Sequence, residues 1–336
     1  MKDNPSLQAD MVVLAIGVTP DTVLAKEAGL ELGIKESIVV NDRMETSVPD
    51  IYAAGDAVQV KHYVTGNDAL ISLAGPANKQ GRIIADNICG GDSRYLGSQG
   101  SSVIKVFDMT AATTGINETN AKKSGLEVDT VILSPMSHAG YYPGGKVMTM
   151  KVVFEKESYR LLGAQIIGYE GVDKRIDVLA TAIHAGLKAT QLKDLDLAYA
   201  PPYSSAKDPV NMAGFMIDNI AKGTLKQWHL EDMDKISKDK SVVLLDVRTV
   251  GEFNRGHMDG FRNIPVDELR ERINEIEKGK PVYLICQSGL RSYIASRILE
   301  GNGYETYNFS GGFRFYDAVV NDRALIEKAY ACGMDY

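Results

Sequence analysis

The stretch Val282-Tyr283-Leu284-Ile285-Cys286-Gln287-Ser288-Gly289-Leu290-Arg291 places a cysteine between an apolar run and a helical pattern. The run 282–285 predicts a buried strand, and residues 293–299 repeat apolar side chains at helical spacing. Cys286 is therefore expected where a strand ends and a helix begins.

Cys286 has the surroundings of a nucleophile. Backbone N–H groups of a short, glycine-containing loop can point at its sulfur, and the helix dipole and Arg291 add positive potential. These effects favour the thiolate, so we expect the pKa of the Cys286 thiol to lie below its usual value. The alternative interpretation is a cysteine buried at a strand end as a small hydrophobic residue.

The spacing from Cys286 to Arg291 distinguishes this loop from a phosphate-binding loop. A phosphatase loop places its arginine one residue later and so makes room for a tetrahedral phosphate, whereas this chain has Ser292 at that position. The shorter loop suits a smaller guest, a single sulfur atom carried on Cys286 as a persulfide.

Residues 226–325 resemble the rhodanese family of sulfurtransferases. Besides the Cys286 loop, the matching motifs are Val242–Arg248, Glu252-Phe253, Gly256–Gly260, Asn263–Pro265 and Ser310–Phe313. The resemblance implies an α/β domain with a parallel sheet, in which Cys286 is the sulfur carrier. It also implies that Asp246, Arg248 and Arg291 organise and charge the pocket. For His257 the expectation stays open between a functional position and a residue that holds a turn.

Composition limits the class of protein. The chain has 336 residues, enough for two or three domains, and its formal charge of −7 argues against nucleic acid as a partner. No apolar run approaches the ~20 residues of a membrane span, and the N-terminus has no apolar signal core, so we expect a cytoplasmic protein without a membrane partner. The three cysteines, Cys89, Cys286 and Cys332, form neither a disulfide framework nor a metal-ligand cluster.

Two segments near the N-terminus predict strands. Met11–Ile16 is an apolar run, and Ile51–Ala54 is a shorter one followed by Gly55 and Asp56. Gly55 lets the backbone approach a ligand, and Asp56 presents a carboxylate at the carboxyl end of the strand, where doubly wound sheets bind their ligands. The alternative is an aspartate in an ordinary turn.

The segment Leu14–Pro20, followed by the Asp56 motif, resembles the flavin-dependent pyridine nucleotide–disulfide oxidoreductases. The resemblance implies that the first segment closes an NAD(P) domain and that the second completes an FAD domain, where Asp56 contacts the ribitol of FAD. Residues 72–89 predict a helix whose N-terminus faces the flavin. The cofactor-binding residues are then Gly55, Asp56, Ala74 and Pro76.

The same resemblance implies segments that these residues do not contain. The FAD fingerprint, the redox-active cysteine and the NAD fingerprint of the family are expected before Met1, since no Gly-x-Gly-x-x-Gly follows a strand here. The chain therefore resembles the C-terminal part of a longer enzyme, and binding of FAD by the chain alone is left open.

Residues 101–216 resemble the dimerisation domain of the same enzymes, which implies a homodimer. The predicted strands are Ser102–Phe107, Val147–Phe154 and Leu162–Ile167. Asp173–Ala185 predicts an amphipathic helix, because its apolar residues fall on one face.

The end of this domain, Leu197–Ser205, contains no histidine. Dithiol enzymes of the family carry an acid–base histidine here, so the segment instead resembles the coenzyme A–disulfide reductase branch, which uses a single cysteine. In that branch tyrosines from the partner subunit reach the reacting thiols, and phenol hydroxyls can donate to a leaving thiolate. The resemblance assigns this role to Tyr199 and Tyr141, with Tyr142 and Tyr203 as substitutes. The alternative is that these rings pack among prolines.

The expected fold class is α/β together with α+β. A partial FAD/NAD(P)-binding Rossmann-like segment covers 1–100, the dimerisation domain 101–216, a connector 217–229, and the rhodanese-like domain 230–336, in which 266–276 predicts a solvated helix.

Three functions follow from the sequence. The first, which we favour, is FAD- and NAD(P)H-dependent reduction of CoA disulfide, CoA persulfide or polysulfide, with sulfane sulfur carried on Cys286. The second is a sulfurtransferase on a dimerising scaffold, without flavin redox activity and with thiosulfate or a persulfide as donor. The third is a non-catalytic dimerisation module.

Overall fold

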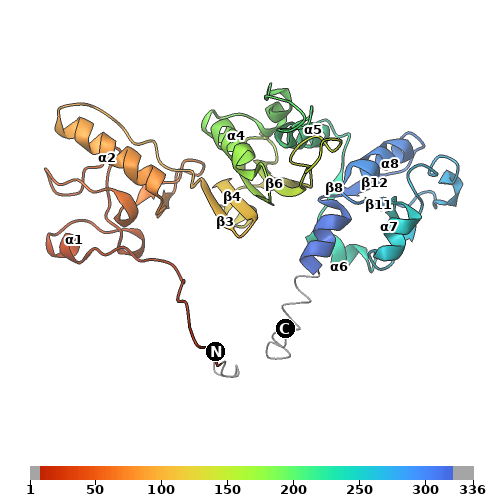
Figure 1. Ribbon diagram of the computed structural model, residues 1–336, viewed down its shortest axis with the longest axis horizontal. Helices are drawn as coiled ribbons and strands as arrows, with labels where there is room; N and C mark the ends of the chain where they lie inside the picture. The colour runs from red at the N-terminus through yellow and green to blue at the C-terminus, as the bar shows by residue number, and fades with distance from the viewer. Residues whose placement is uncertain (1–7, 321–336) are drawn as a thin grey trace. The chain divides into compact units, whose positions relative to one another are not determined.

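The computed structural model describes residues 8–320, which form two compact units, 8–102 and 103–320 (Figure 1). Cys332 lies outside the described residues. In the first unit the helices and strands are short except for α2, which confirms the helix predicted over 72–89. The elements are α1 (Val23–Glu27), η1 (Ile34–Glu36), η2 (Gly55–Ala57), β1 (Val60–Lys61), β2 (Asp68–Ala69) and α2 (Ala74–Ile88).

Both strands predicted near the N-terminus are wrong. Met11 and Ile16 are 80% and 86% exposed, and 11–16 pairs with no strand of the described chain. In the second segment only Tyr52 forms a bridge, to Glu45. A strand requires a partner as well as apolar residues, because its backbone hydrogen bonds are made to another segment.

The second unit begins with an antiparallel sheet in the order β3-β4-β7-β6-β5. The predicted strands are confirmed to within one residue at each end: β3 is Ser102–Val106, β6 is Met148–Glu155 and β7 is Leu161–Gly168. The sheet is completed by β4 (Met109–Gly115) and β5 (Val128–Leu133), with α3 (Glu118–Lys123) between them in the chain.

Helix α4 (Val172–His184) lies against β4 and β7, and α5 (Pro209–Ala221) lies against β5. The predicted amphipathic face of α4 is confirmed, since Ile176, Leu179 and Ile183 are buried. The segment η3 (Ala189–Asp194) joins the two helices and packs on α5.

The C-terminal part of this unit is a five-stranded parallel sheet in the order β10-β9-β11-β12-β8. β11 is Val282–Ile285, as the sequence predicts, and α8 (Leu290–Glu300) follows it and packs on β11 and β12. The other elements are β8 (Gln227–Trp228), η4 (Leu230–Asp232), α6 (Met233–Ile236), β9 (Val243–Asp246), α7 (Val250–Arg255), β10 (Arg262–Asn263), η5 (Ile273–Glu275) and β12 (Thr306–Phe309). The mixed fold class is confirmed.

The solvated helix predicted over 266–276 is wrong. The segment consists of turns and the short η5, and Leu269 and Ile276 are fully buried in the core beside β11. Its charged residues suggested exposure on all faces, whereas two apolar side chains anchor it to the sheet. Burial of two such side chains outweighs the helical preference of the polar residues between them.

Candidate active site

The parallel sheet brings Cys286 and Asp246 to the same edge. Ile285 is paired with Asp246 in the β11–β9 register, so Cys286 follows directly at the carboxyl end of β11. Gly289 is the N-cap of α8 and has φ +100°, a left-handed conformation that favours glycine. The sequence thus turns from strand to helix within four residues and holds the thiol at the foot of α8.

Two hydrogen bonds reach the sulfur of Cys286. The amide of Gly289 lies 3.1 Å from Sγ, and the hydroxyl of Ser292 lies 3.2 Å from it. Within 286–292, one amide and one hydroxyl donate to the sulfur of Cys286. The expectation that several loop amides point at this sulfur is therefore wrong.

Cys286 is also buried, with 1% of its surface exposed, and it belongs to the apolar core of the parallel sheet. Burial agrees with the alternative interpretation of a small hydrophobic residue. The two donors at Sγ distinguish it from such a residue, because a purely packed cysteine has no need of polar partners at hydrogen-bond distance.

Arg291 is paired with a carboxylate on α7. Its two terminal nitrogens each donate to an oxygen of Glu252 at 2.7 Å. Glu252 also accepts from the amide and the hydroxyl of Thr249, which caps α7. The hydrogen bond from Arg291 is the main reason that the pKa of Glu252 is lowered to about 2. The carboxylate of Glu252 therefore balances the positive charge of Arg291.

Asp246 and Arg248 form a buried ion pair, and both side chains are almost fully inaccessible. Arg248 donates to both carboxylate oxygens of Asp246 at 2.7–3.1 Å and to the carbonyl of Gly256 at 2.7 Å. Its guanidinium stacks over the ring of Phe313 at 3.8 Å and lies 3.4 Å from Oε1 of Gln287, next to the thiol. The ion pair thus supports the Cys286 loop through Gln287.

The segment 310–313 covers the Cys286 loop. The amide of Phe313 donates to the carbonyl of Cys286 at 2.8 Å. A Cβ on Gly312 would lie 2.7 Å from the backbone of Ser288, so only glycine fits there. His257 stacks on Phe253 with ring centroids 3.9 Å apart, and its Nδ1 lies 3.1 Å from the Phe253 carbonyl, as expected for a residue that holds a turn.

Tyr141 and Tyr199 meet in the second unit. Their hydroxyl oxygens lie 2.7 Å apart, and the side chains are exposed, at 76% and 45%. The hydrogen bond with Tyr141 is the main reason that the pKa of Tyr199 is raised. Tyr142 instead packs edge-on against the buried His138, and Tyr203 is exposed. The pair assigned by resemblance is therefore the pair whose hydroxyls are in contact.

The four residues expected at a flavin lie together in the first unit. Gly55 has φ +81° and opens η2, where Asp56 exposes its carboxylate. Gly55 donates to the side chain of Gln80 on α2 at 2.7 Å, which ties η2 to the helix whose first turn contains Ala74 and Pro76. No side chain caps this helix N-terminus. A free carboxylate beside uncapped amides fits a ligand with hydroxyl and polar ring groups.

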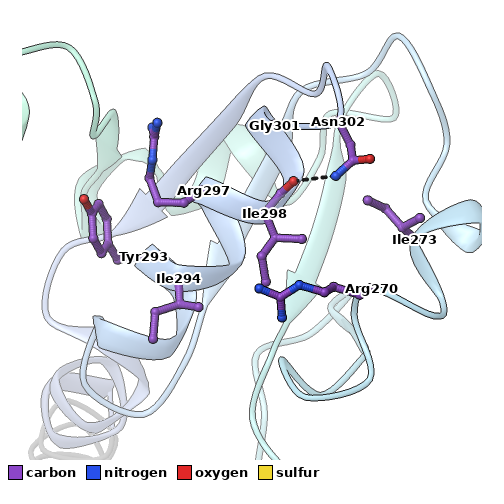
Figure 2. Close-up of a pocket in the computed structure, with 8 residues that line it drawn as sticks. All are labelled: Arg270, Ile273, Tyr293, Ile294, Arg297, Ile298, Gly301 and Asn302. Carbon is purple, nitrogen blue, oxygen red and sulfur yellow. Dashed lines mark hydrogen bonds between the residues drawn. The ribbon is translucent and has the colours of Figure 1, made fainter.

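A groove of about 610 Å³ follows the outer face of α8 (Figure 2). It is lined by Arg270, Ile273, Tyr293, Ile294, Arg297, Ile298, Gly301 and Asn302. Neither Cys286 nor Arg291 lines it, so it is separate from the thiol.

Sequence reasoning missed Ser292 as a partner of the thiol and Glu252 as a partner of Arg291. The spacing from Cys286 identifies Ser292 only as the residue at the position of a phosphatase arginine. Its place on the first turn of α8 was the signal that could have found it, since that turn faces the end of β11. Glu252 belongs to the Glu252-Phe253 motif, but its pairing with Arg291 cannot be predicted from spacing, since the two residues are 39 positions apart.

Three family models match successive parts of the chain. Residues 1–81 match the pyridine nucleotide-disulphide oxidoreductase model, residues 101–209 match the dimerisation domain of the same family, and residues 229–318 match the rhodanese-like domain. The chain belongs to the pyridine nucleotide-disulphide oxidoreductase family. It carries the dimerisation domain of that family and, after it, a rhodanese-like domain.

Curated relatives include an NAD(P)H sulfur oxidoreductase (CoA-dependent) of Pyrococcus furiosus, 38% identical over 208 residues, and a coenzyme A disulfide reductase of Staphylococcus aureus, 35% identical over 207 residues. The matches cover 62% and 61% of this oxidoreductase-family chain and 47% of each relative. The chain thus spans about half the length of the curated relatives it matches.

Solved structures match both the dimerisation and the rhodanese-like parts. The reduced CoADR-RHD of Bacillus anthracis is 48% identical with a TM-score of 0.91, covering 94% of this chain and 57% of that one. An NAD-dependent persulfide reductase from A. fulgidus is 42% identical with a TM-score of 0.84, covering 92% of this chain and 56% of that one. Over residues 8–320, no helix combines the length and apolarity needed to cross a bilayer.

Proposed function

We propose that this chain acts as part of an FAD- and NAD(P)H-dependent reductase of CoA disulfide, CoA persulfide or polysulfide. In this enzyme Cys286 carries sulfane sulfur as a persulfide. The observation that carries the proposal is the setting of Cys286 at the foot of α8, with the Gly289 amide and the Ser292 hydroxyl on its sulfur. The names of the relatives and of the matched structures support the same chemistry.

Sulfur transfer at Cys286 requires no external oxidant or reductant. The thiolate attacks the outer sulfur of a persulfide or of thiosulfate, a new S–S bond forms at Sγ, and the S–S bond of the donor breaks. The electron pair leaves on the donor thiolate or on sulfite. A second thiolate, that of coenzyme A, then takes the outer sulfur and restores the Cys286 thiolate. The Gly289 and Ser292 donors stabilise the negative sulfur in both steps.

Burial of the thiol adds a requirement to this scheme. Because Cys286 is 1% exposed, the side chains around it must move before a donor reaches Sγ. Arg291 and Glu252 are the charged pair nearest along the loop, and they are still 30% and 21% accessible. Their separation would free Arg291 to hold an anionic donor such as thiosulfate.

The tyrosine pair belongs to the reductase part of the proposal. Tyr199 and Tyr141 would hold a thiolate leaving from the substrate by hydrogen bonds, acting in a homodimer formed through the dimerisation domain. Bound FAD would relay electrons from NAD(P)H to the disulfide. Gly55, Asp56 and the first turn of α2, Ala74 to Pro76, would hold FAD through its ribitol and ring.

The experiment is sulfur transfer from thiosulfate to cyanide by the purified chain, measured as thiocyanate. Cys286→Ser should abolish transfer while the circular dichroism spectrum and melting temperature stay near wild type. Cys89→Ser, at the exposed C-cap of α2, is the matched control and should leave transfer unchanged. Equal transfer by Cys286→Ser and wild type would remove Cys286 from the mechanism.

A second candidate is a sulfurtransferase without flavin redox activity, favoured by the self-contained rhodanese-like domain around Cys286. The two candidates differ in one measurement on the purified chain. A flavin absorption band that NAD(P)H bleaches supports the reductase. Sulfur transfer without such a band supports the second candidate.

A further inference from the structure

Arg175 is a buried cation in the α4 helix, far along the chain from either tyrosine. It is 1% exposed, and it pairs with Asp208, which is 3% exposed and caps α5. Its Nη2 lies 2.9 Å and its Nε 3.2 Å from the same oxygen of Asp208. A buried charge of this kind is costly unless every donor is satisfied, so its contacts indicate what it holds.

Nη1 of Arg175 lies 3.2 Å from the carbonyl of Gly171, the N-cap of α4. The other contacts of Arg175 reach two loops. Its Nη2 lies 2.9 Å from the carbonyl of Ser137, four residues before Tyr141. The same nitrogen lies 3.3 Å from the carbonyl of Tyr203 and 3.2 Å from the hydroxyl of Ser204, both shortly after Tyr199. One guanidinium therefore binds the loop that carries Tyr141 and the loop that carries Tyr199.

The two loops are also joined next to this guanidinium. The amide of Ala139 donates to the carbonyl of Ser204 at 3.0 Å, and the Ser204 hydroxyl donates to Asp208 at 2.7 Å. Beyond this junction Tyr141 and Tyr199 extend into solvent, with 76% and 45% of their surfaces exposed. Packing around exposed rings is too sparse to hold two hydroxyls at hydrogen-bond distance, so their alignment depends on the loops beneath them.

We propose that Arg175 is a positioning residue that sets the hydrogen bond between Tyr141 and Tyr199 by clamping the two loops that carry them. Nη2 alone reaches the acceptors of both loops, while Nε and Nη1 fix the plane of the guanidinium through Asp208 and Gly171. A lysine has a single nitrogen, so its ammonium lacks these two fixing contacts and is not held between the loops. The catalytic consequence of the clamp rests on the proposed function, whereas the geometric consequence does not.

The test measures the tyrosine pair directly by ¹⁹F NMR of the chain labelled with fluorotyrosine. Tyr141→Phe and Tyr199→Phe assign the two signals among the 16 tyrosines. In Arg175→Lys the pH midpoint of the Tyr199 signal should fall to the value that Tyr141→Phe gives, because both changes remove the same hydrogen bond. A folded Arg175→Lys whose Tyr199 midpoint equals that of wild type would overturn the proposal.

Two further variants separate positioning from stability. Lys193→Gln breaks the 2.6 Å ion pair with Asp218 on α5, in the same domain, and should lower the melting temperature without moving the Tyr199 midpoint. Ser204→Ala removes one hydroxyl from the clamp and should shift the midpoint in the same direction as Arg175→Lys, but less. If Arg175→Lys does not fold, Ser204→Ala decides alone, and an unchanged midpoint there counts against the clamp.

CoA-disulfide reduction by Arg175→Lys distinguishes this inference from the proposed function. It is measured in the flavin-loaded enzyme of which this chain is proposed to be part. A shifted Tyr199 midpoint together with unchanged reduction would leave the clamp standing and remove the tyrosines from catalysis. An unchanged midpoint with lowered reduction would reject the clamp and leave the tyrosine proposal in place.

Discussion

Arg291 and Glu252 form a two-pronged ion pair, with each carboxylate oxygen 2.7 Å from a guanidinium nitrogen. The pair joins the first turn of α8 to α7, across 39 residues of sequence. Arg291, the cation expected beside the Cys286 thiol, is therefore paired with the carboxylate of Glu252. The contribution of this pair to the free energy of unfolding can be measured by replacing Glu252.

Glu252→Gln should destabilise the chain by about 1–2 kcal/mol at pH 7, because it removes a largely buried, charge-assisted pair. The pKa of Glu252 is lowered from 4.5 to about 2 by Arg291. A lowered carboxyl pKa stabilises the fold above the unfolded pKa, and that stability is lost as pH falls through the folded pKa. The difference between wild type and variant in urea unfolding should therefore shrink between pH 4.5 and pH 2.

Glu268→Gln is the control for this prediction, since its pair with Arg272 at 2.9 Å is on the exposed surface. Its cost should be about 0.5 kcal/mol or less. A Glu252→Gln cost that matches this control, or that does not change with pH, would contradict a stabilising role for the pair.

Ser292→Ala should slow sulfur transfer about tenfold, because it removes the hydroxyl 3.2 Å from the sulfur of Cys286. The matched control is Ser296→Ala one turn later on α8, whose hydroxyl donates to the Tyr293 carbonyl at 2.7 Å. Rates are compared by thiocyanate formation at equal protein concentration. Equal rates in the two variants would mean that the Ser292 hydroxyl does not support the thiolate.

Arg248→Met should destabilise the chain by about 3–5 kcal/mol, since it leaves the carboxylate of Asp246 buried without its partner. Urea unfolding at pH 7 measures the change. Arg255→Met, on the exposed last turn of α7, is the control and should cost less than about 0.5 kcal/mol. The double variant Asp246→Asn with Arg248→Met should recover part of the loss. A single-variant cost near that of the control would show that the pair is not a support of the loop.

Strands with strong local patterns were predictable from sequence. The run 282–285 became β11 without a shift, and β6 and β7 differ from their predicted bounds by one residue at each end. These segments are buried against neighbours supplied by the same unit. The local pattern and the tertiary environment therefore favour the same structure.

The predictions for Met11–Ile16 and for 266–276 are wrong because the local pattern and the tertiary environment disagree. The first is as apolar as a core strand but pairs with nothing in the described chain, so its pattern has no partner to act upon. The second is highly charged, yet Leu269 and Ile276 are buried by segments distant in sequence. Pairing and burial of this kind are long-range properties that no local window contains.

The sequence predicts the grouping of site residues that lie close together along the chain. It does not predict contacts between residues on separate loops, such as Tyr141 and Tyr199. Cys286, Gly289 and Arg291 lie within six residues, so their grouping at the end of β11 follows from the strand–loop–helix pattern. The contact of Tyr141 with Tyr199 spans 58 residues and was reached only through family resemblance. The physical cause of that contact, in the loops below the rings, was not visible in the sequence.

Tyr141→Phe and Tyr199→Phe should each lower CoA-disulfide reduction by about 100-fold in the flavin-loaded enzyme, since each removes one half of a hydrogen-bonded pair that would hold the leaving thiolate. The double variant should cost little more than either single variant, because residues in direct contact act as one unit. Sulfur transfer at Cys286 measured in the same preparations is the internal control and should not change. Losses that add up on a logarithmic scale would mean that the two phenols act independently, and unchanged reduction would remove both from the reductase site.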